Sequence, residues 1–171
     1  ELAEDVYELN METIMVWAKN FADLLGVKFD SDSVRLWAQK NAQYTAENVN
    51  YSTLQSLIKA EENTEEDRAS ALKHVFEIAI ASGAYRLARS KVTSLSNYGT
   101  ISVAKRGDNP VTTKTWNLGG GKEHRSSHVA LAGETVAVTS RFSNGMKYPG
   151  DMQATNDASE IANCTCYLTY N

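Results

Sequence analysis

The feature that most constrains the fold of this chain is a change in hydrophobic spacing near residue 99. Before it, apolar residues recur at every third or fourth position, which places them on one face of an α-helix. After it, glycines become frequent, and short runs rich in Val, Thr and aromatic residues are typical of β-strands. Helices followed by strands predict an α+β fold with a small antiparallel sheet. We expect a helical region, 1–98, and a β-rich region, 99–171, packed as one unit.

The first two helices are expected on either side of Gly26. An apolar series over 2–25 predicts a long helix, and a glycine directly after it is well placed to end it. The polar residues at 30–32 are candidate caps for a second helix. Trp37 lies on the apolar face of that helix, so we assign it to the core rather than to a binding site.

Further helices are expected in the remainder of the helical region. Ser52 is a candidate cap for a separate short helix. Thr64, with Asp67 three residues later, resembles a capping box that begins another helix. Gly83 divides that helix from a last helical stretch, which is expected to end near Asn97.

Strands are expected in four runs of the β-rich region, at residues 100–106, 111–118, 134–140 and 164–170. In the last run, Cys164 and Cys166 would project from the same face of a strand. The distance across two residues of a strand is near the upper limit for a disulfide, and the bridge would be strained. We therefore expect reduced thiols or metal ligands rather than a disulfide.

Charge and hydropathy disfavour two classes of partner. The 17 Lys and Arg residues against 21 Asp and Glu give a net charge of −4, so bulk electrostatics do not favour tight nonspecific binding to duplex DNA. No run approaches the roughly 18 apolar residues that cross a bilayer, and the acidic start differs from a signal peptide. We expect a cytosolic chain with no membrane partner. Because it starts within a helical pattern and without Met, we also expect it to derive from a longer or processed protein.

The segment GGGK at 119–122 does not form a phosphate-binding loop. The Walker pattern requires a glycine where Trp116 stands and a Ser or Thr where Glu123 stands. A nucleophile elbow is also absent, because the sequence contains no G-x-S-x-G. Ser126 and Ser127 are therefore expected to be polar residues of a helix or turn.

Two histidines and the cysteine pair are candidate metal ligands. If the segment before Gly133 is helical, His124 and His128 lie on one face at the i and i+4 spacing of two imidazoles that bind one ion. Cys164 and Cys166 would complete a tetrahedral zinc site with a structural role. The alternative is that the histidines are hydrogen-bonded and that the thiols pack the sheet.

The same segment also admits a catalytic interpretation. His124 or His128 could act as a general base, and Arg125 could stabilise a developing phosphate charge, as in a small metal-independent nuclease or hydrolase. The simpler alternative is that Arg125 pairs with an acidic neighbour, either Glu123 or Glu134. We favour this alternative, because sequence does not reveal the perturbed environments that mark a catalytic site.

The order of several short segments resembles the C-terminal region of the phage Mu F-like minor head proteins, also called the head-morphogenesis family. The resemblance runs from about Asn48 to Tyr170. The positions that match the family pattern are Ala88, Arg89, Trp116, Arg125, Ser127, His128, Leu131, Gly133, Phe142, Gly145, Pro149 to Asp151, Asn163, Cys164 and Cys166. Each piece is short, and the specificity comes from their order and spacing.

The chain departs from the family pattern in three places. Lys91 stands where the family often has Glu. The segment 119–124 replaces a more common acidic and arginine-containing lead-in, so a catalytic role built on these positions is not carried over. His124 lies outside the usual pattern.

The resemblance leaves His128, Cys164 and Cys166 as the main metal ligands, completed by a nearby acid such as Asp151. It implies a virion component present in few copies, assembled in the host cytoplasm and associated with the portal and head proteins. Such a protein assists assembly, packaging or delivery of phage DNA. The same module also occurs at the front of phage-encoded polymorphic toxins, where it serves delivery rather than killing.

Overall fold

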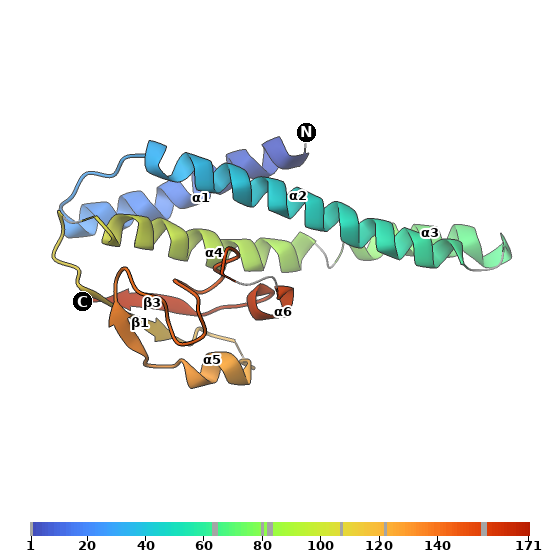
Figure 1. The fold of residues 1–171 in the computed structure, drawn as a ribbon. Coiled ribbons are helices and arrows are strands. Elements are labelled where there is room, and N and C mark those ends of the chain that lie inside the picture. The colour runs from blue at the N-terminus through green and yellow to red at the C-terminus, as the bar shows by residue number, and fades with distance from the viewer. Residues whose placement is uncertain are drawn as a thin grey trace.

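The computed structural model describes residues 2–62, 65–79, 81, 84–106, 108–121, 123–154 and 157–171. A layer of helices lies over a small antiparallel sheet, which confirms the predicted α+β fold (Figure 1). The elements are α1 (Leu2–Leu25), α2 (Asp32–Glu61), α3 (Glu65–Ile78), α4 (Ala84–Ala104), β1 (Thr113–Asn117), α5 (Ser126–Ala130), β2 (Thr135–Ala137), α6 (Ala158–Ile161) and β3 (Tyr167–Tyr170). The predicted roles of Thr64 and Gly83 fall outside the described residues.

The start of the helical layer follows the sequence. Helix α1 ends at Leu25, and Gly26 adopts a positive φ of 69°, the left-handed conformation that glycine tolerates after a helix. Among the candidate caps of α2, Asp30 performs the task, because its Oδ1 accepts a hydrogen bond of 3.0 Å from the backbone N–H of Asp32. Trp37 belongs to the core, as predicted.

The short helix predicted to begin at Ser52 does not exist as a separate element. Helix α2 continues through this position to Glu61. The hydroxyl of Ser52 donates to the carbonyl oxygen of Val49 at 3.0 Å, within the helix. A serine can therefore bond to the preceding turn as well as cap a helix, and the residue type alone does not separate the two cases.

The last helix of the layer is longer than predicted. Helix α4 passes Asn97 and ends at Ala104, so the run 100–106 that we predicted as a strand is helical over its first residues, and the boundary at 98 lies inside α4. Gly99 does not end this helix. A Cβ at Gly99 would lie 3.0 Å from the carbonyl oxygen of Ile14, which shows that the glycine permits close approach of α1. Packing against α1 overrides the strand propensity of this segment.

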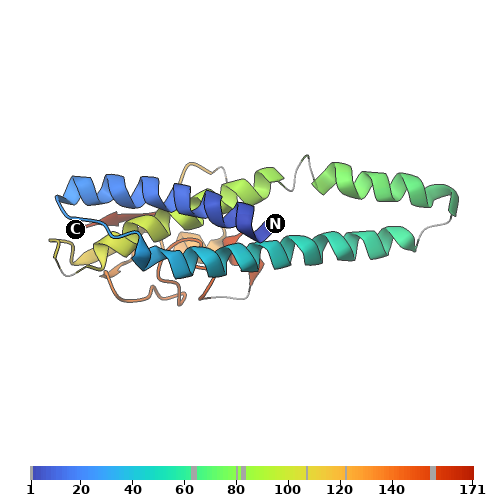
Figure 2. The ribbon, with the colours of Figure 1, turned by 90° about the horizontal axis from the view of Figure 1, so that it is seen from above.

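Figure 2 shows how the helices lie relative to one another. Helix α2 runs alongside α1 over its first half, and its second half continues beyond the body of the molecule beside α3. Helices α1 and α3 thus follow one another along α2. Helix α4 packs against α1 and forms the main contact between the helices and β3.

The sheet has three strands in the order β2-β1-β3, and both pairings are antiparallel. In the predicted run 164–170 only Tyr167–Tyr170 is a strand, so both cysteines precede β3 rather than lie within it. Trp116 on β1 pairs with Leu168 on β3, and both are buried. The main core is continuous from the helices to the sheet and contains Ile14, Val34, Trp37, Leu95, Ile101, Trp116, Leu131, Phe142, Met146, Tyr148, Cys164, Cys166 and Leu168.

Candidate metal centre

His128 lies on the short helix α5, and the residue is 1% exposed. Its ring meets the indole of Trp116 edge-on, with 5.3 Å between the ring centroids. The chain then turns back to the sheet through Gly133, which has a φ of 84° and donates its N–H to the carbonyl oxygen of Trp116 at 2.9 Å. The position of His128 is thus fixed by β1 on one side and by the following turn on the other.

The predicted helical pairing of the two histidines is wrong. Helix α5 begins at Ser126, so His124 lies before it and does not share a helical face with His128. Arg125, between them, is in an extended conformation with φ −62° and ψ 145°. The i and i+4 argument fails because the segment that it treats as one helix begins as an irregular chain.

The two cysteines are held in place by hydrogen bonds from α4. Thr93 donates its hydroxyl to the carbonyl oxygen of Cys164 at 2.5 Å, and the side-chain amide of Asn97 donates to that of Cys166 at 3.2 Å. Both thiols are free and buried. Because side chains from α4 hold the backbone at both cysteines, the helical layer positions the sulfur atoms over the sheet.

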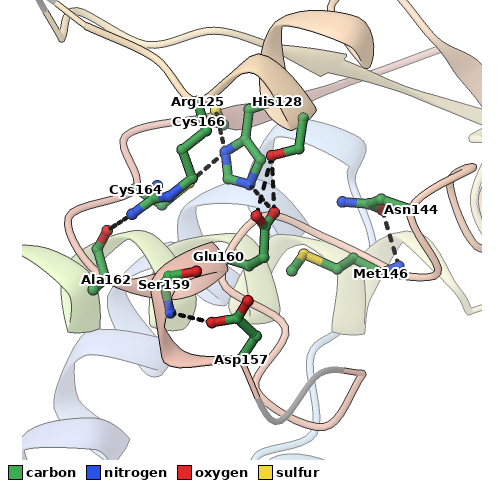
Figure 3. A network of polar contacts seen from close by, with 11 residues as sticks. Arg125, His128, Asn144, Met146, Asp157, Ser159, Glu160, Ala162, Cys164 and Cys166 are labelled. Atoms are coloured by element: carbon green, nitrogen blue, oxygen red, sulfur yellow. Dashed lines mark hydrogen bonds and ion pairs between the residues drawn. The ribbon is translucent and has the colours of Figure 1, made fainter.

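His128 meets both sulfur atoms through the same ring nitrogen (Figure 3). Its Nδ1 lies 3.5 Å from Sγ of Cys166 and 3.7 Å from Sγ of Cys164. The three donor atoms lie within 4.8 Å of one another, and all three residues are buried. One imidazole nitrogen and two thiol sulfurs at this separation are compatible with coordination of a single metal ion.

Glu160, on α6, lies on the other side of the imidazole ring. Its Oε2 is 3.3 Å from Nε2 of His128, which has no well-aligned hydrogen bond. The hydroxyl of Ser127 donates to both carboxylate oxygens, at 3.2 and 3.0 Å. In metal sites, a carboxylate placed in this way orients the ligating histidine through its second nitrogen. We did not identify Glu160 from the sequence.

The electrostatic environment differs between the two thiols. A hydrogen bond from the Cys164 thiol, aided by His128 and opposed by burial, lowers the pKa of Cys166. The same hydrogen bond and burial raise the pKa of Cys164. Cys166 is therefore the sulfur that more readily becomes a thiolate, which is the form that binds metal.

Asp151 does not join this cluster, so its predicted role as an additional ligand is wrong for the described residues. One of its carboxylate oxygens accepts the backbone N–H of Lys147 at 2.9 Å, and the other accepts that of Gln153 at 3.2 Å. Asp151 thus shapes the turn that contains Pro149 and Gly150. An Asp in a turn sequence can either bond to the backbone of the turn or bind a metal, and the sequence alone does not distinguish the two roles.

The three donors open onto a pocket of about 320 Å³. His124 and Arg125 also line it, as do Arg89 and Glu123. The structure therefore brings His124 near the cluster of His128, Cys164 and Cys166 without making it a member. Arg125 donates to the carbonyl oxygen of Ala162.

The predicted pairing of Arg125 with Glu134 is not found. The carboxylate of Glu134 instead accepts hydrogen bonds from the backbone N–H and the hydroxyl of Ser143, at 2.8 and 2.7 Å. Arg125 therefore ties the segment before α5 to the chain just before Cys164. This contact brings together the two segments that supply the donor atoms.

Comparison with known protein families, with curated proteins and with solved structures found no match. Among the described residues, the helices are too short or too polar to be membrane spans.

Proposed function

We propose that His128, Cys164 and Cys166 bind a structural zinc ion. The observation that carries this proposal is that Nδ1 of His128 meets both sulfurs while its Nε2 meets the carboxylate of Glu160. Zinc favours nitrogen and thiolate ligands in tetrahedral geometry, and a carboxylate on the second nitrogen is the usual support of a zinc-bound histidine. A hydrogen-bonded core histidine would not require two sulfurs at one nitrogen.

The ion would join segments that are far apart in the sequence. His128 follows β1, whereas both cysteines directly precede β3. The cysteine backbone is in turn bonded to α4 through Thr93 and Asn97. A three-stranded sheet with strands of three to five residues buries little apolar surface of its own, so a metal at this position would stabilise it against the helices.

His124 lines the same pocket as the three residues that would hold the ion. His124 is therefore the candidate for a fourth protein ligand, and a water molecule is its competitor. A site with four protein ligands is closed and structural, whereas an open position is the arrangement of catalytic zinc. Zinc affinity of a His124→Ala variant distinguishes the two, because loss of a ligand weakens binding and loss of a pocket residue does not.

The biological role that we propose is that of a phage minor head protein, acting with the portal and other head proteins in assembly, packaging or delivery of DNA. Its support is the sequence resemblance together with the placement of the matching residues. Trp116 contacts both His128 and Phe142, with ring centroids 5.3 and 5.2 Å apart. The turn at Gly150 packs on Ser94 of α4, whose hydroxyl donates to its carbonyl oxygen at 2.8 Å. Of the matching residues, Trp116, Leu131, Phe142, Cys164 and Cys166 lie in the main core, whereas Ala88, Arg89, Gly133 and Asn163 are exposed.

Zinc content is the direct test of the metal proposal. Elemental analysis of purified protein should find zinc in equal stoichiometry with the chain, and cobalt substitution should give the thiolate charge-transfer absorption of a cysteine-ligated ion. Cys166→Ser should remove both signals. Protein free of metal after expression with zinc, together with no zinc uptake on titration, would refute the proposal.

Co-expression with a phage portal protein tests the biological role. Retention of the chain on tagged portal or procapsid is the expected result, and the unrelated capsid of another virus serves as the control. A chain that binds zinc but never co-purifies with portal or procapsid would refute the head-protein role and leave the metal site standing. The two proposals therefore fail separately.

A further inference from the structure

A second pocket, of about 690 Å³, lies in the helical half of the molecule. It is lined mainly by α2, α3 and α4, and the α2 residues fall between Tyr44 and Ser56, where α1 gives way to α3 along α2 (Figure 2). Much of the lining is apolar, including Val49, Val75 and Ile78. This size and apolar character are those of small-molecule sites.

The polar group that distinguishes this pocket is the ammonium of Lys91. The residue is only 8% exposed and lines the pocket. Its Nζ donates to Oδ1 of Asn41 at 2.5 Å and lies 3.7 Å from the sulfur of Met152. Both partners are neutral, and burial lowers the pKa of Lys91 to about 8. A buried charge without an opposite charge is costly, so its environment favours the arrival of an anion.

The remaining lining strengthens this charge asymmetry. No Asp or Glu is found among its described lining residues. The side chain of Asn41 cannot supply the missing charge, because it is an amide that also accepts from Asn10 at 3.2 Å. The pocket is therefore apolar over much of its wall and positive at Lys91.

The other buried lysine of the described chain, Lys114, shows the contrasting case. Its Nζ donates to the carbonyl oxygens of Ser140 and Lys147, at 2.6 and 2.8 Å, and lies 5.1 Å from the ring centroid of Phe142. Lys114 thus connects parts of one loop and lines neither of the two pockets described. The Lys91 ammonium instead contacts the side chains of Asn41 and Met152, and both Lys91 and Met152 line the pocket.

We propose that this pocket binds a small molecule with an apolar body that ends in a carboxylate, of the medium-chain fatty acid class. The carboxylate would pair with Lys91, and the apolar body would lie against Val49, Val75 and Ile78. Charge complementarity selects an acid over a neutral apolar ligand, because only an acid offsets the buried ammonium. None of the three proposed zinc ligands lines this pocket, and Asn163 lines both pockets.

Calorimetric titration of the purified full chain with octanoate tests the proposal, with 1-octanol as the uncharged probe of equal chain length. We expect octanoate to bind and 1-octanol to bind at least about tenfold more weakly, which is the scale of one offset charge in a partly buried site. Lys91→Met, which keeps the length of the side chain and removes its charge, should abolish the difference between the two probes. Lys40→Met, on the exposed face of α2, should leave octanoate binding unchanged.

A second variant keeps the test independent of Lys91. Ser52 lines the pocket and is itself exposed, so Ser52→Trp should fill the space without disturbing the core, and octanoate binding should be lost. Circular dichroism confirms that each variant is folded. The proposal is overturned if octanoate does not bind, if it binds no better than 1-octanol, or if Lys91→Met and Ser52→Trp bind it as the parent does.

Discussion

The two halves of the molecule bury polar groups in opposite ways. Beside the sheet, His128, Cys164 and Cys166 gather donor atoms that suit a soft cation. In the helical half, Lys91 is a buried cation with neutral partners. Buried polar groups are normally satisfied within the chain, so an arrangement that is incomplete in charge points to a ligand of the opposite sign. We therefore propose a metal ion as the ligand of one half and an organic acid as the ligand of the other.

Metal removal should have the largest effect and should separate the two halves. Zinc binding to small metal-folded peptides contributes about 10 kcal/mol or more at neutral pH, and a fraction of this would be lost here because the helices pack without the metal. We expect a chelator to lower the melting temperature and to increase hydrogen exchange in β1 and β3 before it does so in α1. An equal melting temperature with and without chelator would contradict the proposal that a metal stabilises the sheet.

Gly119→Ala should disturb, through the backbone, the half that contains His128, Cys164 and Cys166. Gly120→Ala is its matched control. A Cβ at Gly119 would lie 1.9 Å from the carbonyl oxygen of Thr165, the residue between the two cysteines, whereas a Cβ at Gly120 meets nothing within 4 Å. Forcing this contact apart should cost about 3 kcal/mol and weaken metal binding. Chemical denaturation and zinc titration measure both effects, and similar values for the two variants would contradict the placement of this loop.

Lys91→Met should stabilise the free protein in a pH-dependent way. Because the folded pKa of about 8 lies below the ordinary 10.5, the unfolded chain binds more protons between these values, and burial penalises the folded state below pH 8. The variant should therefore be more stable than the parent at pH 7 by up to about 3 kcal/mol. Denaturation curves should show this advantage shrinking as the pH rises above 8. Lys114, whose pKa burial also lowers, is present in both proteins. The effect of Lys91 is therefore the difference in unfolding free energy between the parent and the variant.

Glu160→Gln should have the smallest effect of these four changes. It should affect only the half that contains His128, Cys164 and Cys166. Loss of a carboxylate behind a ligating histidine typically weakens metal binding by about tenfold to a hundredfold. Ser127 can still donate to the amide oxygen, so we expect the fold to be retained. Competition with a colorimetric zinc chelator measures the change. An unchanged affinity would show that the contact of 3.3 Å between Glu160 and His128 does not support the metal.

The sequence predicted the order of helices and strands better than the residues at which each element begins and ends. The change of spacing near residue 99 indicated helices before strands, which the structure confirms. The end of the last helix was predicted too early, because Gly99 resembles a helix terminator in sequence but permits a helix crossing in space. Ser52 was similarly misread as a cap. In both cases the residue type is compatible with two local structures, and packing decides between them.

The candidate metal site was predicted in part. His128, Cys164 and Cys166 were proposed from residue chemistry and the family resemblance, and the structure brings these three together. His124 was paired with His128 by a helical spacing that α5 does not provide. Glu160 was missed because its role depends on the position of α6 beside an imidazole that lies 32 residues earlier in the chain.

By itself, the sequence determined the α+β class and the kinds of donor atoms that a metal could use, because periodicity and side-chain chemistry are local properties. Only the tertiary structure decided which nitrogen of His128 meets the sulfurs, that Glu160 supports it, and that Lys91 is buried beside a pocket. These features depend on distances and burial between segments far apart in the chain. Packing of the helices over the sheet sets those distances, and with them the charge of the ligand that we propose for each half.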